Sequence, residues 1–363
     1  MPCRPGISTM SLGRCFAGHS ISHKLSMATK YGIQGVEIFY EDLADLAHPS
    51  TPSNLISAAT YIRNLCISYG LEIINLQPFM HYEGLLDRQQ HAERIEEMKL
   101  WMRLARALGT DLISVPSTFL PKEEVSKDVS LIVADFREIS DLGLQQTPVI
   151  RFNYESLAWG TYIDKWEQSW DIVQRVDRPN FGLCLDTYNI LGRIYADPTA
   201  IDGRNPNADQ EVKDSIQQMV EQIKPHKEKI FFVQLVDGEK LREPLVPGHP
   251  FYSEDQPARM SWSRNCRLFY GETERGAYMP VKDVAQAIIK DIGFDGWVSF
   301  ELFNRDMNRT DEVVVEELAS RAAVSWKKFV ADLGLETDAS LRLKRPRSIR
   351  TSSDTFEREA ARL

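Results

Sequence analysis

Short hydrophobic runs alternate with longer amphipathic segments along this chain, and the alternation occurs eight times. The runs are rich in β-branched and aromatic residues, as buried strands are. In the amphipathic segments apolar residues recur every three or four positions: Ile95, Met98 and Met102 mark one face of a helix at 93–109, and 162–176 repeats the pattern. The predicted strands are residues 4–9, 34–40, 71–78, 111–117, 147–156, 181–189, 230–236 and 296–303.

Eight strand–helix repeats predict an α/β fold, a single-domain (β/α)8 TIM barrel over residues 1–335. No GxGxxG or GxxxxGK[ST] motif is present, which argues against a nucleotide-binding open sheet. Long connections at 190–210 and 238–280 follow the sixth and seventh strands, and we expect both to form walls or lids of an active site. Residues 336–363 are polar and predict a flexible tail.

Four predicted strands end in the same way, with an apolar run followed by an acidic or amide side chain. Because the carboxyl ends of all barrel strands open onto one face, these four side chains should converge. Three carboxylates in one pocket would repel each other without a cation, and hard oxygen donors suit Mg²⁺ or Mn²⁺. The sequence therefore predicts a site for one divalent metal ion at Glu155, Asp186, Gln234 and Glu301.

The long seventh connection carries a local positive charge. Arg259, Arg264 and Arg267 lie in a stretch, 258–270, that contains no acidic residue. Guanidinium groups bind carboxylates with two parallel hydrogen bonds, so we expect at least one of the three arginines to contact a small anionic substrate. Arg259 and Arg264 are the candidates, with Ser261 adding a hydroxyl donor. Pairing of these arginines with flanking acidic residues is the alternative.

Three further polar residues lie near predicted strand ends. Glu37 ends the second strand and is a candidate substrate contact. His81 follows the third strand and is a candidate general base, although a loop histidine is more often simply solvated. Arg88, close by in sequence, is a candidate contact for the anion.

Composition narrows the class of protein. A formal net charge of −9 argues against nucleic acid and anionic membranes as partners. No apolar run approaches the length of a transmembrane helix, and the N-terminus lacks the apolar stretch of a signal peptide. The five dispersed cysteines indicate reduced thiols in a cytoplasmic enzyme rather than disulfides. Both a monomer and a homo-oligomer are compatible with this composition.

Several longer runs resemble one enzyme family, the fungal 3-dehydroshikimate dehydratases of quinate catabolism, which belong to the xylose isomerase-like barrels. The similarity extends over roughly residues 5 to 335. The runs YESLAWGT and ARMSWSRN are the most specific to the dehydratases. The runs are GVEIF (35–39), YESLAWGT (154–161), LCLDTYNILGR (183–193), ARMSWSRN (258–265) and SFELFN (299–304).

The resemblance implies a metal-dependent lyase that converts 3-dehydroshikimate to protocatechuate and water. It implies that the metal ligands are the four strand-end residues already predicted, and that Ser261 and Arg264 contact the substrate. The chain departs from the family at two positions: many bacterial relatives have a histidine where this chain has Asn189, and some have one at Leu157. Asn189 therefore joins His81 as a candidate catalytic residue.

Other functions on the same barrel make different demands on the sequence. A sugar or sugar-phosphate isomerase or epimerase with the same metal site is the main alternative, and the arginines of the seventh connection favour the dehydratase. A DNA-repair endonuclease needs several histidines at strand ends, and none of the eight predicted strands contains one. A non-catalytic barrel would be expected to have lost metal ligands, whereas all four candidates are present.

Overall fold

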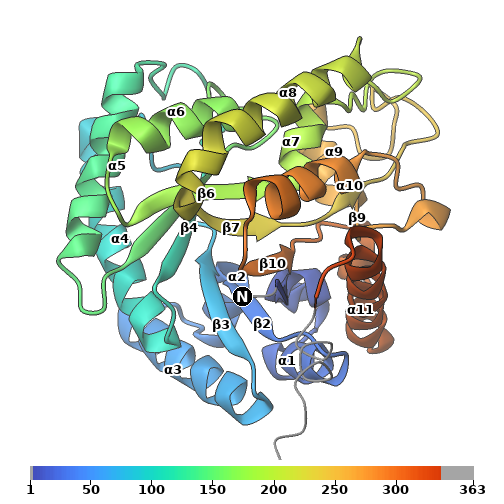
Figure 1. The fold of residues 1–363 in the computed structure, drawn as a ribbon. Helices are drawn as coiled ribbons and strands as arrows, with labels where there is room; N and C mark the ends of the chain where they lie inside the picture. The colour runs from blue at the N-terminus through green and yellow to red at the C-terminus, as the bar shows by residue number, and fades with distance from the viewer. Residues whose placement is uncertain (1–2, 337–363) are drawn as a thin grey trace, which may run out of the picture.

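Eight parallel strands close into a barrel with helices around it, as the computed structural model shows for residues 3–336 (Figure 1). Around the barrel the strands follow the order β1-β10-β7-β6-β5-β4-β3-β2. Their bounds are β1 Arg4–Ser8, β2 Gly35–Phe39, β3 Glu72–Gln77, β4 Leu112–Pro116, β5 Arg151–Glu155, β6 Phe181–Asp186, β7 Ile230–Gln234 and β10 Trp297–Phe300. All eight predicted strands and the predicted TIM barrel are confirmed.

The helices that cover the barrel, and those in its loops, are given by their bounds. The α-helices are α1 Ile21–Lys30, α2 Tyr40–Leu46, α3 Pro52–Tyr69, α4 Arg88–Leu108, α5 Val129–Leu144, α6 Trp166–Val176, α7 Thr187–Ile194, α8 Ala208–Ile223, α9 Ala258–Cys266, α10 Val281–Gln286 and α11 Val313–Leu333. Shorter helical turns are η1 Thr9–Leu12, η2 Cys15–Ala17, η3 Lys224–Lys229, η4 Thr273–Arg275, η5 Ala287–Ile292 and η6 Arg305–Asn308. None of the described helices combines the length and apolar character needed to cross a bilayer.

Local chemistry explains where the helices begin and end. The Asp87 side chain caps α4 by accepting hydrogen bonds from the backbone N–H groups of Gln89 and Gln90. The helix ends at Gly109, whose φ of 86° lies in the left-handed region that favours glycine. The predicted helix at 93–109 is therefore confirmed, but it begins earlier, at Arg88. The prediction missed its first turn because that turn is polar and carries no apolar repeat.

The strands position polar side chains at one end of the barrel. Every residue of β4 and β6 is buried, because helices pack on the outer face and side chains fill the interior. The β-sheet register pairs Asp186 with Gln234 and Ser299 with Gln234. The ends of β6, β7 and β10 therefore lie side by side, with Glu301 directly after β10.

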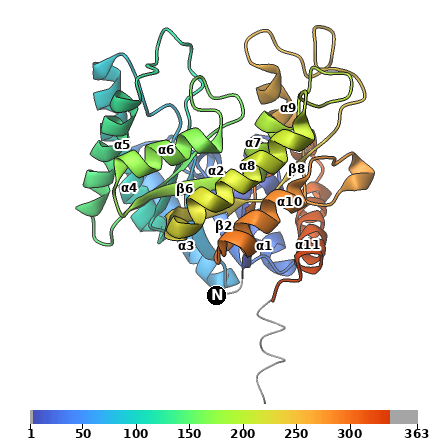
Figure 2. The ribbon, with the colours of Figure 1, turned by 45° about the horizontal axis from the view of Figure 1, so that its top comes forward.

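The two long connections contain short elements that the sequence did not predict. The sixth, 190–210, is helical only at its ends, where α7 extends to Ile194 and α8 begins at Ala208. The seventh contains α9 and a two-stranded antiparallel sheet of β8 (Asp237–Gly238) and β9 (Arg267–Leu268). Figures 1 and 2 show α7 and α9 side by side above the barrel. Of the predicted tail, 336–363, only Glu336 belongs to the described residues, and the rest lies outside them.

Candidate metal centre and active site

Three carboxylates from three strand ends meet at the centre of the barrel mouth. Glu155 ends β5, Asp186 ends β6, and Glu301 follows β10. Each offers an oxygen within 4.8 Å of an oxygen of the others, and all three side chains are buried. The predicted convergence is thus found for these residues.

Gln234 lies beside this group and is also buried. Its amide nitrogen donates to Glu37 Oε2 at 3.2 Å, and its amide oxygen accepts from the Cys184 thiol at 3.4 Å. The Gln234 amide also acts to lower the pKa of Glu301, so the two side chains lie near one another. A half-turn of the carboxamide would exchange its oxygen and nitrogen, so Gln234 is placed to offer an oxygen to a cation held by Glu301.

Burial and mutual repulsion perturb the acidic groups. Burial raises the pKa of Glu155 well above its usual range, and the carboxylates of Glu301 and Asp186 raise it further. Burial also raises the pKa of Glu301 to about 7, although the charge of Arg267 opposes the shift. Uncompensated negative charge of this kind favours a cation at the cluster.

Asn189 holds two of the carboxylates in place. Its amide nitrogen donates to Glu155 Oε1 at 2.6 Å and to Asp186 Oδ2 at 2.9 Å, and its oxygen accepts from the backbone N–H of Ala158 at 3.0 Å. It is buried and does not line the cavity, and an amide is not a proton acceptor at neutral pH. Asn189 is therefore a contact that holds two carboxylates of the cluster, and its role as a catalytic residue stays a prediction.

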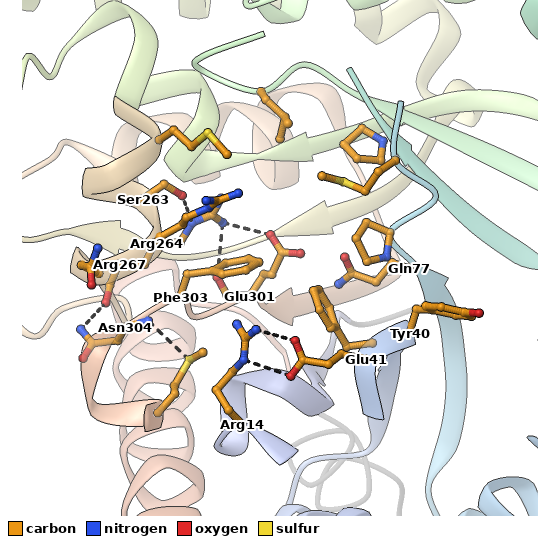
Figure 3. A pocket seen from close by; sticks show the side chains of 18 of the residues that line it. Arg14, Tyr40, Glu41, Gln77, Ser263, Arg264, Arg267, Glu301, Phe303 and Asn304 are labelled. Atoms are coloured by element: carbon orange, nitrogen blue, oxygen red, sulfur yellow. Dashed lines mark hydrogen bonds and ion pairs between the residues drawn. The ribbon is translucent and has the colours of Figure 1, made fainter. Parts of the chain in front are cut away.

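A cavity of about 720 Å³ opens above the acid cluster, and Glu155 and Glu301 form part of its wall. That volume is typical of a small-molecule site. Much of the remaining wall is apolar or aromatic, and Figure 3 shows polar side chains on several sides of the cavity. The apolar and aromatic lining residues are Phe16, Phe39, Tyr40, Pro78, Met80, Pro116, Phe119, Leu157, Trp159, Met260, Phe303 and Met307.

Two arginines of the seventh connection, Arg264 and Arg267, line the cavity. Arg264 donates to Gln256 Oε1 at 2.6 Å and, among the described residues, forms no ion pair within 4.0 Å with an acidic side chain. Burial and the nearby charge of Arg14 lower the pKa of Arg264. Arg14 lines the cavity as well, but Glu41 already pairs with it, as Figure 3 shows. Arg264 is therefore placed to receive an anion.

Arg267 is the residue that the predicted site omitted. The sequence marked it only as part of the positive stretch, yet its guanidinium donates to both Asp186 and Glu301 and lines the cavity. Figure 3 shows the contact of Arg267 with Glu301. Burial acts to lower the pKa of Arg267, but the two carboxylates outweigh that effect and raise it. Arg267 Nε also donates to Ser263 Oγ at 3.0 Å, but nothing in the sequence distinguished Arg267 from Arg259 and Arg264.

Arg259 and Ser261 lie outside the cavity, which corrects their expected contact with a substrate. The Arg259 guanidinium donates to the carbonyl oxygens of Gly192 and Ala196 and to Asn205 Oδ1, so it joins α9 to the sixth connection. Ser261 is fully buried and accepts from Gln256. The two side chains point away from the cavity because α9 presents Met260, Ser263 and Arg264 to it.

Of the two long connections, only the seventh lines the cavity. The seventh forms part of the cavity wall, as expected, through α9 and β9. Within 190–210 no residue lines the cavity, so the sixth connection does not form part of its wall, and its expected role as a lid stays a prediction. It packs behind α9 instead, where Arg259 holds it.

Glu37, His81 and Arg88 also lie outside the cavity wall. Glu37 is buried beneath the cluster and accepts hydrogen bonds from Gln77, Gln234, Asn75 and Ser299, and burial followed by repulsion from Glu301 raises its pKa to about 8. Glu37 thus orders the amide side chains around it, and its contact with a substrate stays a prediction.

His81 and Arg88 are held by other partners. The His81 ring packs edge-on against Phe119, and its Nδ1 lies 3.2 Å from Thr118 Oγ1. Burial lowers the pKa of His81 to about 4, which makes it a weak base. Arg88 pairs with Asp135, with Nη2 and Oδ1 2.6 Å apart. Neither residue is brought into the cavity, contrary to expectation.

Comparison with known proteins shows which family this chain belongs to and which enzymes it is similar to over most of its length. Residues 25–326 match the family model of the xylose isomerase-like TIM barrel. A 3-dehydroshikimate dehydratase of Neurospora crassa is 55% identical over 351 residues, which cover 94% of this chain and 97% of that protein. A 3-dehydroshikimate dehydratase of Pseudomonas aeruginosa is 30% identical over 298 residues, 82% of this chain but only 38% of that protein.

A solved structure shares the same architecture. The fusion of a xylose isomerase-like TIM barrel with a 4-hydroxyphenylpyruvate dioxygenase is 24% identical, with a TM-score of 0.69. The match covers 97% of this chain and 46% of the fusion protein. At this identity the likeness shows the fold alone.

Proposed function

Since this chain belongs to the xylose isomerase-like TIM barrel family, we propose that it is a 3-dehydroshikimate dehydratase, a hydro-lyase that forms protocatechuate and water. The observation that carries the proposal is the 55% identity to the Neurospora enzyme over nearly the whole of both chains. The buried carboxylates at the barrel mouth and the cavity above them support it. Reduced cysteines favour the cytoplasm, and the family resemblance favours quinate catabolism.

We propose Glu155, Asp186, Gln234 and Glu301 as the ligands of one divalent cation. The donor set fits such an ion, because three buried carboxylates within 4.8 Å repel one another and carry the hard oxygens that Mg²⁺ or Mn²⁺ prefers. When bound there, the cation would supply Lewis-acid polarisation of the substrate ketone. Asn189 orients Glu155 and Asp186 for this purpose.

Arg264 is the proposed contact for the substrate carboxylate. It is exposed, lines the cavity and has no acidic partner among residues 3–336, so an incoming anion would replace only its contact with Gln256. A guanidinium that holds the carboxylate fixes the orientation of the ring above the acid cluster. The aromatic wall, including Phe119, Trp159 and Phe303, excludes water around the ring.

The reaction itself asks for no redox partner. A proton leaves the carbon beside the ketone, a hydroxyl group leaves as water, and tautomerisation completes an aromatic ring. His81, outside the cavity wall and with a pKa of about 4, is poorly suited to take that proton. The carboxylates in the cavity wall are those of Glu41, Glu155 and Glu301. Since Glu155 and Glu301 are proposed metal ligands, we propose Glu41 as the proton acceptor.

A direct assay tests the proposal. Purified protein, stripped with a chelator and resupplied with Mg²⁺ or Mn²⁺, should convert 3-dehydroshikimate into a product with the ultraviolet absorbance of a catechol. The stripped protein without added metal is the control and should be inactive. No protocatechuate with either metal would refute the dehydratase, and epimerisation of a sugar by the same sample would favour the isomerase alternative.

A further inference from the structure

Arg267 is a wholly buried arginine whose charge is directed at the acid cluster. Its Nη1 lies 2.8 Å from Asp186 Oδ2, 3.0 Å from Glu301 Oε2 and 3.3 Å from the carbonyl oxygen of Glu301. The side chain of Arg267 is 1% exposed. One guanidinium nitrogen thus bridges two of the three carboxylates that we propose as metal ligands.

The fold holds this guanidinium in place from several directions. Its central carbon lies 4.4 Å from the ring centroid of Tyr188 and 4.9 Å from that of Phe303. The backbone of Arg267 is fixed as well, because its N–H donates to the Phe303 carbonyl at 3.0 Å and its own carbonyl accepts from Asn304 at 2.8 Å. Ser263 Oγ accepts from Nε. The position of the charge is therefore set by β9, α9 and the segment after β10.

The charges of the site balance only when Arg267 is included. Three ionised carboxylates exceed a dication by one negative charge, and in a buried site an uncompensated charge is costly. The guanidinium supplies the one positive charge that is missing. Before a metal binds, it is the only cation that the described residues place within 4.0 Å of Asp186 or Glu301.

We propose that Arg267 is the resident counter-cation of the metal centre, which stabilises the metal-free carboxylates and competes with the incoming dication for Asp186 and Glu301. The inference rests on the metal site of the proposed function. It differs from a role in which Arg267 merely orients the ligands, because an orienting residue strengthens metal binding whereas a competing cation weakens it.

Arg267→Met tests the two roles without any substrate. The thioether can fill the space between Tyr188 and Phe303 but carries no charge. We expect the chelator-stripped variant to melt several degrees below stripped wild type, because the buried carboxylates lose their counter-charge. Calorimetric titration with Mn²⁺ should give a Kd roughly tenfold lower than wild type, since the dication no longer competes with a neighbouring cation.

Arg264→Met is the matched control, because Arg264 lines the same cavity and has no acidic partner among the described residues. It should leave both the melting temperature of the stripped protein and the Kd for Mn²⁺ within error of wild type. Arg267→Lys keeps a positive charge at the cluster and should lie between wild type and Arg267→Met in both measurements.

A charge-matched double variant protects the test against simple misfolding. Arg267→Met combined with Glu301→Gln has the same net charge at the cluster as wild type, so the stripped double variant should melt above the stripped Arg267→Met protein. A double variant no more stable than Arg267→Met would overturn the proposal. Weaker Mn²⁺ binding by Arg267→Met, or an unchanged melting temperature of its stripped form, would overturn it as well.

These measurements are separate from the test of the proposed function. Wild type that binds Mn²⁺ but forms no protocatechuate would refute the dehydratase and leave the counter-cation role intact. If wild type forms protocatechuate and Arg267→Met binds Mn²⁺ more weakly than wild type, the dehydratase stands and the counter-cation role is refuted.

Discussion

Replacing Asn189 with alanine should weaken metal binding without abolishing the reaction. The substitution removes hydrogen bonds to Glu155 and Asp186, at 2.6 and 2.9 Å, and leaves the N–H of Ala158 without its acceptor. Hydrogen bonds to charged groups contribute about 1.5–3 kcal/mol each. Water that enters the space left by the side chain should replace part of that interaction.

The expected change in metal affinity follows from other metal sites, in which residues that hydrogen-bond to the metal ligands have been replaced. Losing such a contact typically costs about 10- to 100-fold in metal affinity, or about 1.4–2.7 kcal/mol. Calorimetric titration of stripped Asn189→Ala with Mn²⁺ measures this directly, and saturating metal should then restore most of kcat. Circular dichroism of the stripped variant controls for loss of the fold.

Two outcomes would contradict this reasoning. A Kd for Mn²⁺ within twofold of wild type would show that the contacts of Asn189 do not organise the ligands. A normal Kd together with a kcat that saturating metal cannot restore would instead place Asn189 in the chemical step, as the sequence alone suggested.

Four further predictions concern a metal ligand, the anion contact, the pH dependence of metal binding and α9. Glu155→Ala should abolish activity and Mn²⁺ binding while the stripped protein melts no lower than wild type, because burial and its acidic neighbours already disfavour that charge; retained turnover and metal content would contradict its assignment as a ligand. Arg264→Ala should raise KM for 3-dehydroshikimate about 10- to 100-fold, from about 1.5–3 kcal/mol for a hydrogen bond to a charged group, and unchanged steady-state kinetics would reject the contact. The Kd for Mn²⁺ should rise as pH falls below about 7, because burial raises the pKa of Glu301 to about 7 and a protonated carboxyl is a poor ligand; an affinity independent of pH between 5 and 8 would contradict this. Arg259→Ala should lower the melting temperature through its lost contacts to Gly192 and Ala196 while KM stays unchanged, and a raised KM with an unchanged melting temperature would return Arg259 to the substrate site.

The barrel and its acid cluster could be predicted from the chain alone. Strand and helix periodicities are local properties, so the eight strands and the helix α4 are readable wherever apolar residues repeat with a fixed spacing. Closure of a parallel barrel then brings every strand end to one face, whatever the loops do. Glu155, Asp186 and Glu301 therefore meet as predicted, because their positions depend on the strands and not on the connections.

The arginines show what only the tertiary structure decided. Arg259, Arg264 and Arg267 lie within nine residues and look alike in sequence, yet one holds the sixth connection, one faces the cavity and one neutralises the cluster. The orientation of α9 over the barrel places Arg259 and Arg264, whereas Arg267 lies on β9. Gly192 and Glu301, which are partners of Arg259 and Arg267, lie far away along the chain, so long-range packing decided which of these charges reaches the site.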